Sequence, residues 1–112
     1  MPRSNADDTE ITRGSGNVFA DIGLADPDEE AIKARLVMTL RSEMTRRKLS
    51  QAKAAELIGL AQPDVSNLLR GRVAGFSLHR MLEIMEALGN DVEITVRSTG
   101  TERRGRRTLT VA

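Results

Sequence analysis

The 112-residue sequence contains no cysteine, tryptophan or tyrosine and only two phenylalanines, Phe19 and Phe76. Without cysteine the chain can form neither a disulfide nor a thiolate nucleophile nor a cysteine-ligated zinc site, which suits the reducing cytoplasm. With so few aromatic side chains, its core must be built from Leu, Ile, Val, Met and Ala. No apolar run approaches the ~20 residues that a membrane-spanning helix needs, so we expect neither a membrane span nor a signal peptide.

The chain also lacks the residue groupings that enzymes and metal sites require. His79 is the only histidine, and neither a nucleophile nor a set of metal ligands accompanies it. There is no glycine-rich phosphate loop and no pair of carboxylates suited to acid–base catalysis. The sequence therefore predicts a protein that is not an enzyme and that has no catalytic residues, no cofactor and no metal site.

A chain of 112 residues corresponds to one small domain with tails, since single domains usually contain ~100–150 residues. Its net charge of +1 conceals a strong asymmetry. Residues 1–30 hold eight carboxylates against two arginines, a net charge of −6, whereas residues 31–112 carry +7. A basic body with an acidic arm favours a nucleic-acid-binding protein with a second interaction at the arm, although a solvated acidic tail has the same composition.

Composition divides the chain into three parts. Residues 1–16 are polar with almost nothing apolar, which predicts a disordered N-terminal arm. Residues 17–98 are predicted to form the domain, and residues 99–112 a basic tail that contains four arginines. The first apolar side chains of the domain lie in a segment too short to fold alone, and they must pack either on this domain or on a partner protein: Val18, Phe19 and Ile22.

Local signals predict a long helix that begins at Asp26 and runs to about Lys48. Asp26 can cap the helix, Pro27 suits its first position, and Glu29 completes a capping box. Its inward stripe is expected to consist of Ile32, Leu36, Val37, Leu40 and Met44, and its outward side of Lys33, Arg35, Arg41 and Glu43. Ser77 is predicted to cap a later helix whose buried side consists of Leu78, Met81, Leu82, Met85 and Leu88.

Between these helices, residues 51–70 predict two short helices joined by a tight turn, the spacing of a DNA-reading helix-turn-helix. Gly59 stands at the turn, because glycine adopts without penalty the left-handed conformation that commonly ends a helix. Pro63 suits the first turn of the second helix. The apolar face before the turn is expected to consist of Leu57 and Ile58, and the buried face after it of Val65, Leu68 and Leu69.

The other face of the second short helix carries residues that can hydrogen-bond to DNA: Gln62, Asp64, Ser66, Asn67 and Arg70. Because a terminal amide can pair with both N6 and N7 of adenine, we predict that Gln62 and Asn67 read base edges, with Ser66 as a further candidate. Ala61 stands where a capping side chain is usual, so Gln62 could instead cap its own helix. Arg70 and Arg72 are assigned to DNA phosphates.

After residue 90 the apolar period changes from helical to alternating. Val92, Ile94 and Val96 alternate with polar residues, which predicts a half-buried β-strand. A single strand in a helical domain leaves its edge groups unpaired, and pairing with the same strand of a second subunit would satisfy them. We therefore predict dimerisation through these three residues, together with the helix that follows the motif. A local hairpin between residues 91–98 and residues 108–111 is the alternative.

Five positions of the 51–70 motif resemble the Xre/Cro-repressor type of bacterial and phage helix-turn-helix regulators. That family favours Gln first, Ala fifth, Gly ninth, an apolar β-branched residue fifteenth and an apolar residue eighteenth, and this sequence has Gln51, Ala55, Gly59, Val65 and Leu68. The resemblance implies a mainly α, lambda-repressor-like bundle of four to five helices, followed here by the predicted strand. It also implies that Gln51 holds a DNA phosphate.

The wider stretch from Gly14 to Val96 resembles the antitoxins of HigBA-type toxin–antitoxin pairs, through GNVFADIGL, QPDVSNLLRGR, FSL and ALGNDVEITV. This resemblance implies a cytoplasmic transcriptional repressor that binds a palindromic double-stranded operator as a homodimer. It also implies a partner, a HigB- or RelE-like ribonuclease toxin, which would contact Val18, Phe19 and Ile22. A stand-alone regulator of phage or restriction–modification type, without a toxin partner, is the alternative.

Overall fold

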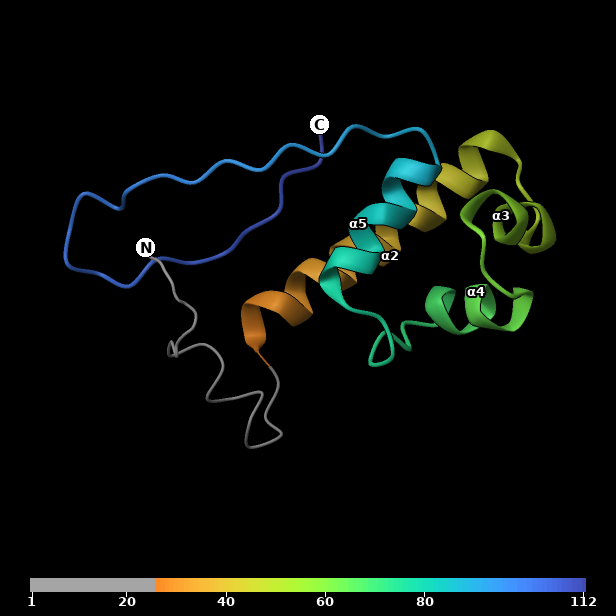
Figure 1. Cartoon of the computed structure of the whole chain (residues 1–112), viewed down its shortest axis with the longest axis horizontal. Coiled ribbons are helices and arrows are strands. Elements are labelled where there is room, and N and C mark those ends of the chain that lie inside the picture. The colour runs from red at the N-terminus through yellow and green to blue at the C-terminus, as the bar shows by residue number, and fades with distance from the viewer. Residues whose placement is uncertain (1–25) are drawn as a thin grey trace. The chain divides into compact units, whose positions relative to one another are not determined.

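A computed structural model describes residues 26–112, which form four α-helices followed by a C-terminal segment without regular secondary structure (Figure 1). The mainly α fold predicted from the sequence is confirmed for this part of the chain. In chain order the helices are α2 (Pro27–Arg47), α3 (Gln51–Ile58), α4 (Gln62–Leu69) and α5 (Leu78–Ala87).

Helix α2 begins where the capping signals predict. The Asp26 carboxylate accepts hydrogen bonds from the backbone N–H groups of Asp28 at 3.0 Å and Glu29 at 3.3 Å, which satisfies donors that have no partner inside the helix. The predicted inward stripe is buried throughout. The prediction that Lys33 faces outward is wrong, because its side chain is only 5% exposed.

The predicted turn between α3 and α4 is formed. Ser50 caps α3, with its hydroxyl oxygen accepting from the Lys53 N–H at 3.0 Å. Gly59 ends the helix at φ 82° and ψ 33°, the left-handed conformation. Ile58 is buried as expected, whereas Leu57 is 40% exposed, so the apolar face of α3 is narrower than the sequence suggested.

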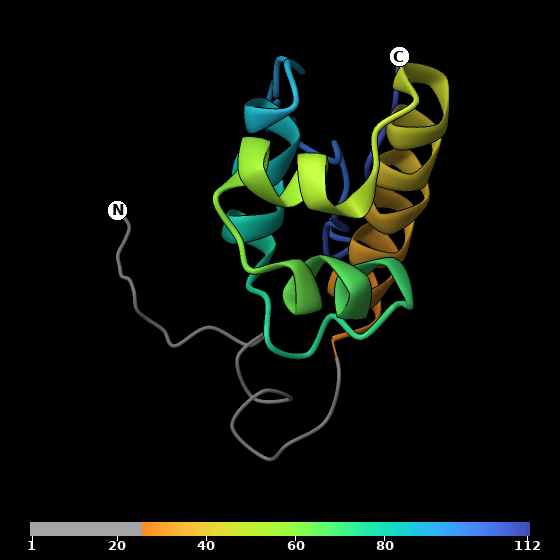
Figure 2. The same ribbon diagram turned by 90° about the vertical axis from the view of Figure 1, so that its right-hand side faces the viewer.

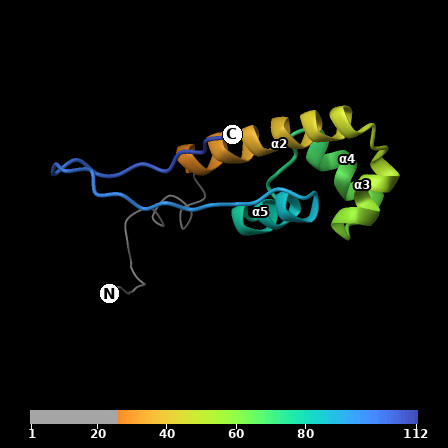
Figure 3. The ribbon, with the colours of Figure 1, turned by 90° about the horizontal axis from the view of Figure 1, so that it is seen from above.

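The core is formed by side chains from all four helices. Helices α2 and α5 run side by side, and α3 and α4 lie across them (Figures 2 and 3). The largest fully buried side chains are Leu40 of α2, Val65 and Leu68 of α4, and Ile84 of α5. Half-buried Phe76 packs against this cluster from the loop before α5. Burial of Val65 and Leu68 therefore fixes which face of α4 turns away from the core.

The predicted C-terminal strand is absent from residues 26–112. Residues 91–98 run outward in extended form, turn near Gly100 and return as an extended stretch over residues 104–112 (Figures 1 and 3). No backbone hydrogen bond joins the two stretches, so the alternative hairpin is not formed either. The physical reason is that a β-strand is defined by backbone hydrogen bonds to a neighbouring strand, and the two stretches of this single chain make no such bonds to each other.

Several predictions fall on residues outside the described range, among them the N-terminal arm of residues 1–16. The candidate toxin contacts lie there too: Val18, Phe19 and Ile22. Within residues 26–112, no helix is both long enough and apolar enough to cross a membrane.

Candidate nucleic-acid interface

Helix α4 is amphipathic, with Val65 and Leu68 buried as the sequence predicted and Leu69 only half-buried. Val65 and Leu68, at 0% and 1% exposure, hold its inner face in the core. Gln62 and the other polar residues at its start are exposed, and Ser66 and Asn67 are half-buried beside them. Because one face is so firmly buried, the orientation of the polar face is set by packing, and this face can approach a groove of DNA.

The structure shows that Gln62 does not cap its own helix. Ala61 occupies the cap position in extended conformation and provides no side-chain hydrogen bond. The side chain of Gln62 makes no hydrogen bond to any of the residues that the structure describes. Its amide oxygen and its two N–H donors therefore remain available to an external partner.

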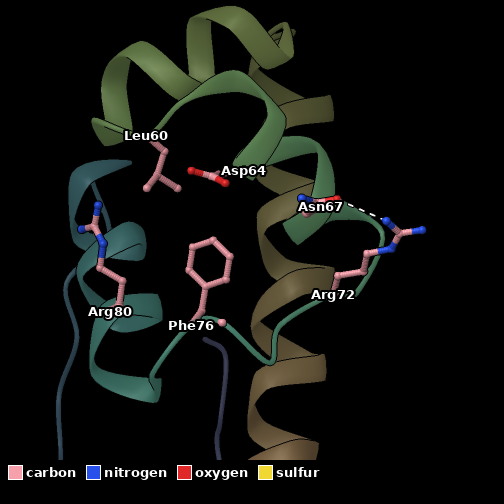
Figure 4. A pocket seen from close by; sticks show the side chains of 7 residues that line it. Leu60, Asp64, Asn67, Arg72, Phe76 and Arg80 are labelled. Carbon is pink, nitrogen blue, oxygen red and sulfur yellow. Dashed lines mark hydrogen bonds between the residues drawn. The ribbon is translucent and has the colours of Figure 1, made fainter.

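The side chain of Asn67, by contrast, takes part in a hydrogen bond. The Arg72 guanidinium donates through Nη1 to the Asn67 side-chain oxygen at 3.4 Å, a contact drawn in Figure 4. The sequence predicted different targets for these two residues, a base edge for Asn67 and a phosphate for Arg72. The structure brings them together because the backbone turns back after α4, where Gly71 has φ 81° and the Arg72 N–H donates to the Asn67 backbone oxygen at 3.0 Å.

A cleft of about 480 Å³ lies next to this pair. The ring of Phe76 points into it, Leu60 and Asp64 line one side, and Arg80 lines the other (Figure 4). The cleft thus has an apolar floor with cationic and anionic groups at its edge. The Asp64 carboxylate disfavours a phosphate inside the cleft itself, since like charges repel.

The predicted phosphate contacts come from the start of α3 and from the segment after α4. Gln51 is exposed at the first position of α3, Arg70 is exposed directly after α4, and Arg72 lies in the following loop. The side chains of Gln51 and Arg70 make no hydrogen bond or ion pair within residues 26–112. The start of α3 adds a helix N-terminus, where unpaired N–H groups and the helix dipole favour an anion.

The three predicted dimerisation residues do not share one environment. Val92 is half-buried and packs against the core. Ile94 and Val96 are 78% and 92% exposed on the extended segment. The apolar alternation therefore leaves two side chains in water that a second surface could cover.

Arg41 contributes to the position of α4, a role that the sequence analysis missed. Its guanidinium donates through Nε at 2.9 Å, and also through Nη2, to the backbone oxygen of Leu69. A cation at the end of α4 satisfies a terminal carbonyl and complements the helix dipole. Arg47 does the same for α5, donating to the Leu88 oxygen at 2.6 Å. The sequence offers one indication of this role for Arg41, which is its position beside the apolar stripe of α2.

No cluster of histidine and carboxylate residues suited to a metal ion occurs among residues 26–112. The candidate interface consists of amide, hydroxyl and guanidinium groups on and around α3 and α4. These groups bind by hydrogen bonding and charge, and they suit recognition of a polyanion with donor and acceptor groups along its edge.

Comparison with known proteins gives a consistent result. A family model described as a helix-turn-helix domain matches residues 18–97. A solved structure of a protein assigned to the XRE family of transcriptional regulators is 39% identical in sequence and superposes with a TM-score of 0.70. The match covers 79% of this chain and 99% of that chain. No curated protein matches the chain.

Proposed function

Because the chain belongs to the helix-turn-helix domain family, we propose that it is an XRE-type DNA-binding transcriptional regulator that reads its operator with helix α4. The observation that carries this proposal is the packing of α4. Two side chains that are at most 1% exposed hold its inner face, while on the opposite face Gln62 is exposed and Asn67 is half-buried. The solved XRE-family relative supports the same function.

In this proposal α4 enters the major groove and its amides contact base edges. Gln62 and Asn67 each pair with an adenine through N6 and N7, and Ser66 bonds to a base or to a phosphate. Gln51, Arg70 and Arg72 hold the backbone on either side and fix the register of α4. Each good amide–adenine pair contributes about 1–3 kcal/mol of discrimination against other bases.

Two glutamines at equivalent places provide a matched test of these roles. Gln62 and Gln51 are both exposed and both occupy the first position of a helix. In an operator selected from random DNA, Gln62→Ala should cost about 1–3 kcal/mol at one base pair, whereas Gln51→Ala should weaken all sequences alike. A footprint and base preference unchanged by combined Gln62→Ala and Asn67→Ala substitution would show that α4 is not the reading element.

The finer proposal is a homodimer on a palindromic operator. Two copies pair through residues 91–98. Each extended stretch then gains the inter-strand backbone hydrogen bonds that its own chain does not provide, and the exposed side chains of Ile94 and Val96 are covered. The two α4 helices then enter successive major grooves about 34 Å apart. With three phosphate contacts per subunit, log K should fall with log[salt] at a slope of about −5.

Sedimentation equilibrium tests the dimer directly. Ile94→Lys places a charge on the apolar side of the extended segment and should yield a monomer. The neighbouring Thr95→Lys, also at an exposed position but on the polar side, should remain dimeric and serves as the control. A wild-type chain that stays monomeric with and without operator DNA would exclude this interface.

We further propose that the regulator is an antitoxin whose partner is a small basic ribonuclease of RelE type. Two observations support this: the resemblance of residues 14–96 to HigA-like antitoxins, and the net charge of −6 on residues 1–30, which complements a basic surface. In this role the protein represses its own operon and neutralises the toxin.

Co-expression with the product of the adjacent gene, followed by co-purification, tests the antitoxin role. A complex that dissociates at high salt and that requires residues 1–30 is expected. If the two products do not associate, the protein is a stand-alone regulator. Because operator binding is measured without the partner, that result leaves the DNA-binding proposal intact.

A further inference from the structure

The contact between Arg72 and Asn67 bears on which base is read. A guanidinium group has only donors, so the atom of Asn67 that faces Arg72 must be its oxygen and not its nitrogen. The 3.4 Å bond from Arg72 Nη1 to Asn67 Oδ1 therefore selects one of the two orientations of the amide. The alternative orientation would place two N–H donors against a cation.

The selected orientation keeps the groups that adenine needs. Asn67 Oδ1 has two acceptor positions and Nδ2 has two hydrogens. Arg72 occupies one of the acceptor positions, which leaves one acceptor and both donors for a base edge. Adenine offers a complementary donor at N6 and acceptor at N7. An amide held in one orientation loses less conformational entropy on binding than one that rotates freely.

Arg72 can act in this way while it also contacts the DNA backbone. Its guanidinium has five N–H donors, and the bond to Asn67 uses only one of them. The side chain is exposed, so in free protein water competes for the bond. On DNA the exclusion of water strengthens the same bond.

We infer that Arg72 is a positioning residue for base recognition, which holds the Asn67 amide for adenine through its bond to Oδ1. This inference rests on the proposed function, since it assigns a role within the DNA-reading face. It differs from the simpler assignment of Arg72 to a phosphate, because a phosphate contact alone carries no sequence information.

Arg70 provides the matched control. Like Arg72 it is an exposed arginine that follows α4, but its side chain bonds to no other described residue. The experiment measures binding of the full chain to its selected operator and to variants carrying each base at each position, over a range of salt concentrations. The proteins are wild type, Arg70→Ala, Arg72→Ala, Arg72→Lys, Asn67→Ala and the Arg72→Ala/Asn67→Ala double variant, with thermal unfolding to confirm that each folds.

Three results are expected. Arg70→Ala weakens all sequences alike and reduces the salt slope by about one. Arg72→Ala additionally lowers the preference for adenine at one base pair by about fivefold or more, and adds nothing to that loss when Asn67 is already alanine. Arg72→Lys keeps the salt slope but does not restore the adenine preference, because an ammonium has one nitrogen and cannot bond to the Asn67 oxygen and to a phosphate from separate nitrogens, as a guanidinium can.

The inference is overturned if Arg72→Ala behaves like Arg70→Ala, with a uniform loss and an unchanged base preference. It is also overturned if the losses in the double variant are additive at that base pair. A wild-type chain that selects no sequence at all would instead remove the proposed function, which is a separate and recognisable outcome.

Discussion

Replacement of Gly59 by alanine tests whether backbone conformation alone sets the turn between α3 and α4. Gly59 has φ 82°, and a Cβ built on it meets no atom within 4 Å. Its N–H donates to the Ala55 oxygen at 2.8 Å, and the next N–H, of Leu60, donates to the same oxygen at 3.0 Å. The alanine Cβ would therefore collide with no atom, and any loss of stability in Gly59→Ala comes from the strain of an L-residue in the left-handed conformation.

The size of the expected loss in the free energy of unfolding follows from that strain. An L-residue in the left-handed region costs about 1–2 kcal/mol, and alanine recovers about 0.4–1 kcal/mol by restricting the unfolded chain. The net loss for Gly59→Ala is therefore about 1 kcal/mol. Gly59→Val should lose more, because a β-branched side chain tolerates positive φ poorly. In a domain of this size, 1 kcal/mol lowers Tm by about 4–8 °C.

Thermal and urea unfolding measure this loss, and Gly75 supplies the control. A Cβ at Gly75 also meets nothing within 4 Å, but its φ lies outside the left-handed region. Gly75→Ala should therefore leave the free energy of unfolding unchanged or raise it slightly. The reasoning is refuted if Gly59→Ala is as stable as wild type, or if both substitutions destabilise equally.

Three further predictions concern the frame that holds α4. Ser50→Ala should lower the free energy of unfolding by about 1 kcal/mol, because the hydroxyl bond to the Lys53 N–H is lost; Ser50→Asp should restore most of it in urea titrations, and a failure to do so would argue against a capping role. Arg41→Ala should speed amide hydrogen exchange in the last turn of α4 but not in α5, because only the carbonyl of Leu69 loses its donor; uniform acceleration would contradict a local effect. Leu68→Ala should cost about 2–5 kcal/mol, since this side chain is 1% exposed, and a loss below 1 kcal/mol by calorimetry would show that the core is not centred there.

The starts of the helices were predictable because their signals are local. Asp26, Ser50 and Ser77 each bond to an N–H two or three residues later, so the cap and its partner lie within one turn of sequence. The same holds for Gly59, where the required conformation depends on a single residue. The buried and exposed faces of α4 followed from the three- and four-residue spacing of its apolar side chains.

The wrong predictions concern two kinds of residue. Some lie at the boundary between the buried and exposed faces of a helix, and others lie in a segment whose secondary structure depends on pairing with a distant stretch of backbone. Periodicity placed Lys33 outside and Leu57 inside, but Lys33 is only 5% exposed and Leu57 is 40% exposed. The alternation of Val92, Ile94 and Val96 predicted a strand, and alternation describes only how side chains are distributed. Whether a strand forms depends on backbone hydrogen bonds to a second stretch of chain, and residues 104–112 make no such bonds with residues 91–98.

The sequence by itself determined where α3 and α4 begin and end and which residues α4 exposes, because caps, glycine and apolar spacing act within one or two helical turns. Only the tertiary structure decided that Arg41 holds the end of α4, since the two bonded residues are 28 positions apart. It also decided that Arg72 meets Asn67, because that contact depends on how the chain turns back after the helix. Helix α4 is encoded locally, whereas the side chains that bond to its end and to the Asn67 amide are brought to it by folding.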